Sequence, residues 1–202
     1  MFRRNKVARR GCPFLLYVRS SLERANESRR EMEAVNVKLL KQSETDQMTG
    51  LANRYRLNDY SDKVLDYCYE HRMPLAMEIL DIDFFKQYND NYGHQQGDEC
   101  IIAIADELKK MEDRQTFCAR YGGDEFMVVI YNTSKTEIED ILKQLSREKD
   151  RLNSSGNNMP IDYACGWAIS DADSECTIQM LLDKADYYMY ENKQAYKKSK
   201  KS

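Results

Sequence analysis

The order of strand-length and helix-length segments constrains this fold more than any other feature of the sequence. Four apolar runs have the length of strands: Pro74–Ile82, Thr116–Tyr121, Glu125–Tyr131 and Ile161–Ser170. Segments with helical character lie before, between and after them: Asn53–Tyr69, Phe84–Asn91, Asp98–Met111, Lys135–Leu152 and Ile178–Lys193. The second and third runs are separated by Gly122-Gly123, which predicts a hairpin. The order predicts an α+β fold with a mixed, mainly antiparallel central sheet surrounded by helices.

A further helix is predicted before this pattern, over Ser21–Ser43, where there is no glycine or proline. Its apolar residues follow a 3-4 spacing interrupted by Arg29 and Asn36; they are Leu22, Ala25, Met32 and Leu39. This indicates either an imperfect dimer seam or an amphipathic helix packed on its own domain. We expect a basic segment and linker or dimerisation helix over residues 1–44, and one globular domain over 45–202.

Composition excludes several classes of protein. With 42% hydrophobic and 32% charged residues, the chain is typical of a soluble globular domain. A net charge of −3 disfavours a general nucleic-acid binder. The six cysteines form no C-x-x-C pair, which disfavours zinc and favours a reducing cytoplasm. The early apolar run Cys12–Val18 is too short for a membrane span.

Two carboxylates are placed at strand ends. Asp81 ends one apolar strand and Asp124 begins the second arm of the hairpin, so the two converge if these strands are neighbours. Such a pair, with backbone oxygens nearby, can hold Mg²⁺ together with substrate phosphates. Asp83 precedes a predicted helix and is interpreted as its N-cap. Gly122 and Gly123 are also what an ordinary hairpin turn contains, but a turn leaves the acids after them unexplained.

Three ordered motifs carry a resemblance to a known family. They are DQMTGLANR at 46–54, DIDFFKQYNDNYGHQQGDE at 81–99 and YGGDEF at 121–126. Together they resemble the GGDEF family of diguanylate cyclases over Asp46–Lys193. The resemblance implies an α/β sandwich of the nucleotide-cyclase or palm-like, ferredoxin-like type, with an N-terminal helix added. It also implies GTP as substrate and Mg²⁺ or Mn²⁺ as cofactor.

The resemblance assigns roles position by position. The implied metal ligands are the side chains of Asp81, Asp124 and Glu125 and the backbone carbonyl of Ile82. The implied catalytic residues are Asp124 as proton acceptor, and Lys86 and Lys193 as cations that neutralise phosphate charge. Solvated helix lysines remain the alternative interpretation of both lysines.

Substrate binding is implied for a second group of residues. Asn89 and Asp98 would read the guanine edge, since an amide and a carboxylate match its donors and acceptors. His94 would lie near the nucleotide, with filling a turn as the alternative. Gly122 and Gly123 would lie against the substrate.

The implied reaction joins two GTP molecules into cyclic di-GMP and releases two pyrophosphates. Each domain of this family holds one GTP, so a homodimer with active sites face to face is expected, with Ser21–Ser43 setting their distance. An upstream sensor domain is a possible further partner. The alternatives are a catalytically silent GTP-binding scaffold and a coiled-coil adaptor; the acidic cluster disfavours both.

The chain departs from the family pattern in two places. The R-x-x-D sequence that often accompanies product inhibition would fall on Asp113 and Thr116. Product inhibition through that site is therefore not expected. Near the C-terminus the usual A-K-x-x-G-R-N is only approximated by residues 192–198, with Lys197 at the arginine position.

Overall fold

The computed structural model describes residues 13–42, 44–154, 160–171 and 175–199. The chain divides into two compact units, 1–42 and 43–202. The first contains helix α1, Pro13–Gln42, which begins eight residues earlier than predicted. Pro13 suits this start, because the first helical position needs no intrahelical N–H bond. Leu22, Met32 and Leu39 of the predicted seam are more than half exposed.

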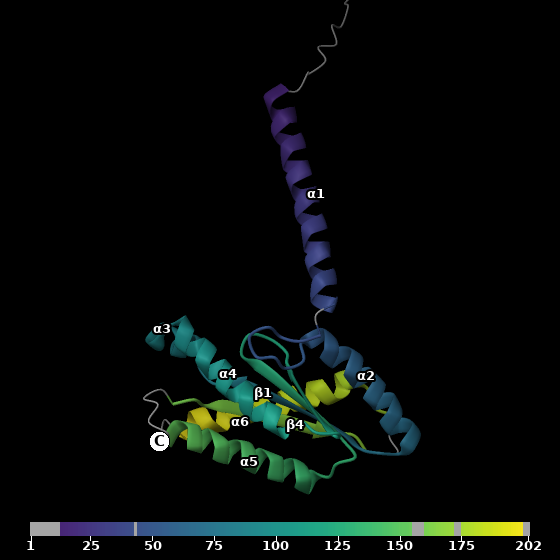
Figure 1. The fold of residues 1–202 in the computed structure, drawn as a ribbon, viewed down its shortest axis with the longest axis vertical. Coiled ribbons are helices and arrows are strands. Elements are labelled where there is room, and N and C mark those ends of the chain that lie inside the picture. Colours follow the sequence, from purple (N-terminus) through teal and green to yellow (C-terminus); the bar gives the residue numbers. More distant parts are fainter. Residues whose placement is uncertain (1–12, 43, 155–159, 172–174, 200–202) are drawn as a thin grey trace, which may run out of the picture. The chain divides into compact units, whose positions relative to one another are not determined.

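The second unit is built on one sheet of four strands in the order β2-β3-β1-β4, all paired antiparallel (Figure 1). The strands are β1 Leu75–Ile82, β2 Thr116–Arg120, β3 Glu125–Tyr131 and β4 Tyr163–Ile169. The helices are α2 Arg54–His71, α3 Phe85–Tyr92, α4 His94–Met111, α5 Lys135–Ser154 and α6 Ile178–Ser199. An isolated parallel bridge joins Ala52 to Ala119 beside β2. The predicted α+β class is confirmed.

Helices cover both faces of the sheet. Leu80 and Val128 pack with α4 and α5 on one face, in a cluster that includes Ile104 and Ile138. Met77 packs with α2 and α6 on the other face. Side chains alternate along β1, so Asp81 belongs to the face that carries α6. Helix α6 lies close to β4, because a Cβ atom on Gly166 would stand 2.1 Å from the backbone oxygen of Ala185.

One local prediction is wrong. The N-cap of α3 is Phe84, in the left-handed region at φ 55°, and not Asp83. The backbone N–H of Asp83 donates to the carbonyl of Asp162 at 2.9 Å, which ties it to the β4 side of the sheet. This long-range bond keeps Asp83 outside the cap position that its sequence context favours.

Two composition-based expectations can be compared with the structure. The five described cysteines are free thiols, in keeping with the absence of paired cysteine motifs. Cys118 is fully buried in the core, as expected of a small apolar side chain. None of the helices in the described ranges combines the length and apolar character needed to cross a bilayer.

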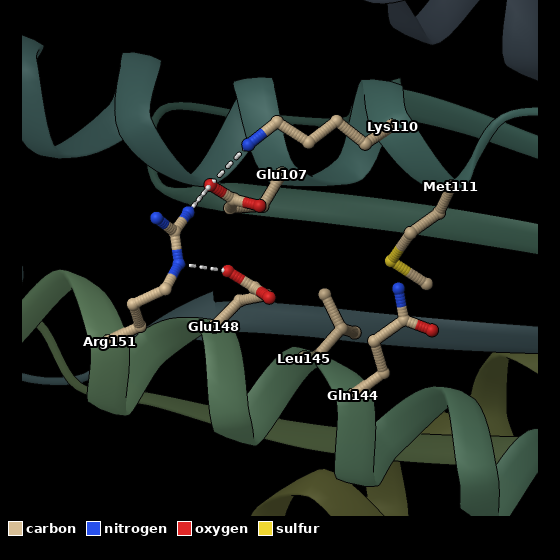
Figure 2. Close-up of a pocket in the computed structure, with 7 residues that line it drawn as sticks. All are labelled: Glu107, Lys110, Met111, Gln144, Leu145, Glu148 and Arg151. Carbon is tan, nitrogen blue, oxygen red and sulfur yellow. Dashed lines mark hydrogen bonds and ion pairs between the residues drawn. The ribbon is translucent and has the colours of Figure 1, made fainter.

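A small pocket of about 150 Å³ lies between α4 and α5 (Figure 2). The Glu107 carboxylate is mostly buried there and accepts from Lys110 Nζ at 2.7 Å and from Arg151 Nη2 at 3.3 Å. Arg151 also donates to Glu148 at 2.5 Å. Because these charges satisfy one another on the sheet face opposite Asp81, we interpret the pocket as a structural ion-pair network joining the two helices.

Candidate active site

The pairing of β1 with β3 brings the predicted acids together. Asp81 stands directly opposite Glu125 in the register, and the Ile82 N–H donates to the Asp124 carbonyl at 3.2 Å. The two strands are neighbours, so the condition that the sequence left open is met. Asp81, Asp124 and Glu125 therefore share one corner at the end of the sheet.

The carboxylates of Asp81, Asp124 and Glu125 repel one another at this corner. Burial, together with the charge of Asp81, raises the pKa of Asp124 above its ordinary value. Burial and the charges of Asp81 and Asp124 likewise raise the pKa of Glu125. Lys193 opposes both effects and donates to Asp81 Oδ1 at 2.5 Å, with both side chains about one-fifth exposed. A further cation at this corner would be stabilised by the same field.

The donor set fits a hard divalent cation that is bound with a nucleotide. Across the described ranges, no three histidine, cysteine or acidic side chains stand close enough to enclose a metal by themselves. Mg²⁺ commonly takes only one or two carboxylates and completes its shell with phosphates and water. The carboxylates of Asp81 and Asp124 are oxygen donors of that kind, so the corner fits a hard divalent cation.

The sequence reasoning missed Arg120, which holds the hairpin turn. Its Nε donates to the Gly122 carbonyl at 3.1 Å and its Nη2 to the Gly123 carbonyl at 2.7 Å. Its Nη1 donates to Asp46 Oδ1 at 3.1 Å. Asp46 belongs to the first of the three motifs, and that motif was the only hint of this interaction in the sequence. Nothing in the sequence indicated that Arg120 is the partner of Asp46.

The two turn glycines are not required by the backbone conformation of the hairpin. Neither Gly122 nor Gly123 has a positive φ. A Cβ atom on Gly122 would stand 2.7 Å from Glu125 Oε2, whereas one on Gly123 would have nothing within 4 Å. Gly122 thus makes room for the Glu125 carboxylate, and Gly123 borders open space.

A second group of predicted residues lies at the junction of α3 and α4. Asn89 Oδ1 is buried with no hydrogen-bond partner among the described residues. A Cβ atom on Gly97 would lie 1.8 Å from it, so this glycine lets Asn89 approach the backbone beside Asp98. The structure therefore brings Asn89 near Asp98 in the fold. His94 and Asp98 are exposed on α4.

The remaining predicted positions are less informative. Lys86 is exposed on α3, and its role stays a prediction. The Lys197 side chain lies outside the described residues. Asp113 is engaged locally, because its Oδ1 accepts from the N–H groups of Gln115 and Thr116, each at 2.8 Å.

Comparisons with known proteins show which family this chain belongs to. A family model described as diguanylate cyclase, GGDEF domain, matches residues 43–199. The chain belongs to the GGDEF family of diguanylate cyclases. It is 29% identical over 177 residues to diguanylate cyclase DgcP of Pseudomonas aeruginosa, covering 86% of this chain and 26% of that protein. It is 31% identical over 185 residues to diguanylate cyclase DgcN of Escherichia coli, covering 89% of this chain and 44% of that protein. The GGDEF chain thus spans less than half the length of these relatives.

Solved GGDEF structures have the same fold. The GGDEF domain of DgcB from Caulobacter crescentus, in complex with c-di-GMP, is similar at a TM-score of 0.68 and 28% identity, over 75% of this chain and 88% of that one. The coiled coil and GGDEF domain of DgcB is similar at a TM-score of 0.70 and 24% identity, over 88% of this chain and 95% of that one. The second likeness concerns the fold alone.

Proposed function

We propose that this GGDEF chain is a diguanylate cyclase that converts two GTP molecules into cyclic di-GMP and two pyrophosphates. The observation that carries the proposal is the register that sets Asp81 opposite Glu125, with Asp124 beside them. The names of its relatives support the same activity.

Asp124 is the proposed acceptor of the proton from the attacking 3′-hydroxyl. Its raised pKa, caused first by burial and then by Asp81, makes it a stronger base than an ordinary aspartate. Lewis-acid activation of the hydroxyl and the phosphates is the chemistry that Mg²⁺ or Mn²⁺ would supply when held by Asp81, Asp124 and the Ile82 carbonyl, with Glu125 in support. The chain's own residues position the reactants around that centre.

Lys193 has a proposed part in triphosphate binding. Its ammonium donates to Asp81 and neutralises that carboxylate. When a divalent cation takes over that neutralisation, the lysine can turn to the phosphate oxygens. Lys86 is proposed for the same purpose from α3, and His94 for a place beside the nucleotide.

Guanine selection is proposed for Asn89 and Asp98. The unpartnered Asn89 Oδ1 is the supporting observation, because a buried carbonyl oxygen without a donor is stabilised by a ligand that supplies one. Gly97→Ala tests this, since the added methyl displaces Asn89. We expect GTP affinity to fall relative to ATP affinity, measured by competition with a fluorescent nucleotide. Unchanged selectivity would contradict the assignment.

Pairing of two chains through α1 is proposed because Leu22, Met32 and Leu39 expose an apolar seam. Each paired domain would present one GTP to the other. Removal of residues 1–42 is expected to lower turnover and to shift the sedimentation coefficient toward that of a monomer. Full turnover by the truncated chain at low micromolar concentration would refute the role of the helix.

We also propose that product inhibition through positions 113 and 116 is absent.

The proposed activity is tested by incubating the chain with GTP and Mg²⁺ and analysing the products. We expect cyclic di-GMP from the wild type and none from Asp124→Asn. GTP binding without any product would favour the silent scaffold. Equal turnover by both proteins would show that the assignment of Asp124 is wrong.

A further inference from the structure

Arg120 connects two parts of the chain that the proposed mechanism does not join. Its guanidinium bonds both glycine carbonyls of the hairpin turn and the carboxylate of Asp46, which lies 74 residues away. The Arg120 side chain is only 11% exposed, so it is a fixed part of the structure and not a surface arginine free to swing toward a ligand.

We propose that Arg120 is a positioning residue, which orients the peptide groups of the Gly122-Gly123 turn so that the Gly123 N–H serves as a donor to the triphosphate. The inference rests on the proposed use of GTP and deepens it.

Peptide geometry provides the first step. A trans peptide group is planar, with its carbonyl and N–H pointing in opposite directions. Because Arg120 draws the Gly122 carbonyl to one side, the Gly123 N–H must point to the other. No hydrogen bond found in the described residues involves that N–H. Gly123 is exposed, and nothing lies within 4 Å of the position where its Cβ would stand, so the turn is open at this residue.

The backbone N–H groups of the two residues that flank Gly123 already interact with other groups. The Gly122 N–H donates to the Glu125 carbonyl at 3.2 Å. The Asp124 N–H acts on the carboxylate of its own side chain and partly offsets the raised pKa of that group. Gly123 is therefore the position in the turn with a donor to offer, and its direction is set by the bonds of Arg120 to the carbonyls on either side of it.

Asp46 supplies the second step, because it fixes Arg120. Its Oδ1 accepts from Arg120 Nη1 at 3.1 Å, from the Thr49 N–H at 2.9 Å and from Thr49 Oγ1 at 2.7 Å. Burial alone would raise the pKa of Asp46, but these bonds outweigh it and the net pKa is lowered. The carboxylate stays ionised and holds the guanidinium against the turn.

The geometry requires an arginine. A guanidinium presents several N–H groups in a planar fork, and here three of its nitrogens have separate acceptors. A lysine ammonium at this position has a single nitrogen and cannot span the same three acceptors. Arg120→Lys therefore keeps the charge and loses the orientation of the turn.

The experiment compares ligands with and without phosphates. Affinities for α,β-methylene-GTP, which cannot release pyrophosphate, and for guanosine are measured by titration calorimetry with Mg²⁺ present. For Arg120→Lys we expect roughly tenfold weaker binding of the triphosphate analogue, the loss of about one charge-assisted hydrogen bond, and unchanged guanosine binding. Arg56→Lys is the matched control, because Arg56 is a half-exposed arginine on α2 that pairs with Glu44 and touches no turn carbonyl.

A second measurement follows the Gly123 N–H directly by nuclear magnetic resonance. The chain has eight glycines, so a sample labelled with ¹⁵N-glycine gives few enough amide signals to assign Gly123. In the wild type the Gly123 signal should shift with the triphosphate analogue and not with guanosine, and Asp46→Asn should reduce that shift.

Equal loss of guanosine and triphosphate affinity in Arg120→Lys, or a Gly123 signal that ignores the triphosphate in the wild type, would overturn the proposal. A wild type that binds the analogue but forms no cyclic di-GMP would refute the proposed function and leave the result for Arg120 intact.

Discussion

Glu78 is a buried carboxylic acid in the middle of the sheet, and replacing it should change how stability depends on pH. It lies on β1, three residues before Asp81, and is 1% exposed. Neither of its oxygens meets hydrogen-bond geometry with any described group. Burial raises its pKa to about 7, only partly opposed by the neighbouring Cys165 thiol. We predict that Glu78→Gln is more stable than the wild type above neutral pH.

The magnitude follows from proton linkage. An acid with a raised pKa in the folded state binds protons more tightly when folded, so stability falls as pH rises. The loss begins near the ordinary pKa of 4.5 and is complete above about 7. That pKa difference corresponds to about 3 kcal/mol of unfolding free energy, since each pKa unit is worth about 1.4 kcal/mol. Glutamine has no titrating proton and lacks this dependence.

The assay is urea unfolding at about pH 5 and about pH 8, which together span most of the predicted change. Fluorescence of the one tryptophan, Trp167, reports directly, because it is paired with Glu78 across β1 and β4. The difference in unfolding free energy between Glu78→Gln and the wild type should grow by about 2.5 kcal/mol between the two pH values, since part of the effect is already lost at about pH 5. Glu70→Gln on the surface of α2 is the matched control. A difference that stays constant with pH would refute the reasoning.

Gly122 and Lys193 give two further predictions. Gly122→Ala should push the Glu125 carboxylate away and raise the Mg²⁺ concentration needed for half-maximal turnover several-fold, with little change in thermal unfolding temperature. Lys193→Met should release Asp81 from its ion pair, so the nucleotide-free protein binds Mn²⁺ more tightly, measured by electron paramagnetic resonance, while turnover falls. Unchanged Mn²⁺ affinity would show that Lys193 does not compete with the cation.

Local patterns in the sequence were sufficient to locate most elements. The predicted third strand, Glu125–Tyr131, has the observed bounds, and the helix predicted from Lys135 begins there. Element ends were less predictable: α6 continues to Ser199, beyond the predicted Lys193, because periodicity fades where a helix leaves the core. The Asp83 cap failed because a backbone bond to Asp162, far along the chain, competes with local capping.

The sequence by itself determined the order of strands and helices, the family, and the acidic residues at the ends of two apolar runs. Only the tertiary structure decided which strands are neighbours, and hence that Asp81 faces Glu125 and that Lys193, 112 residues away, neutralises it. It also decided that Arg120 holds the turn through Asp46. The physical reason is that periodicity and capping act within a few residues, whereas the direction and partners of a charged side chain depend on sheet order and packing across the whole domain.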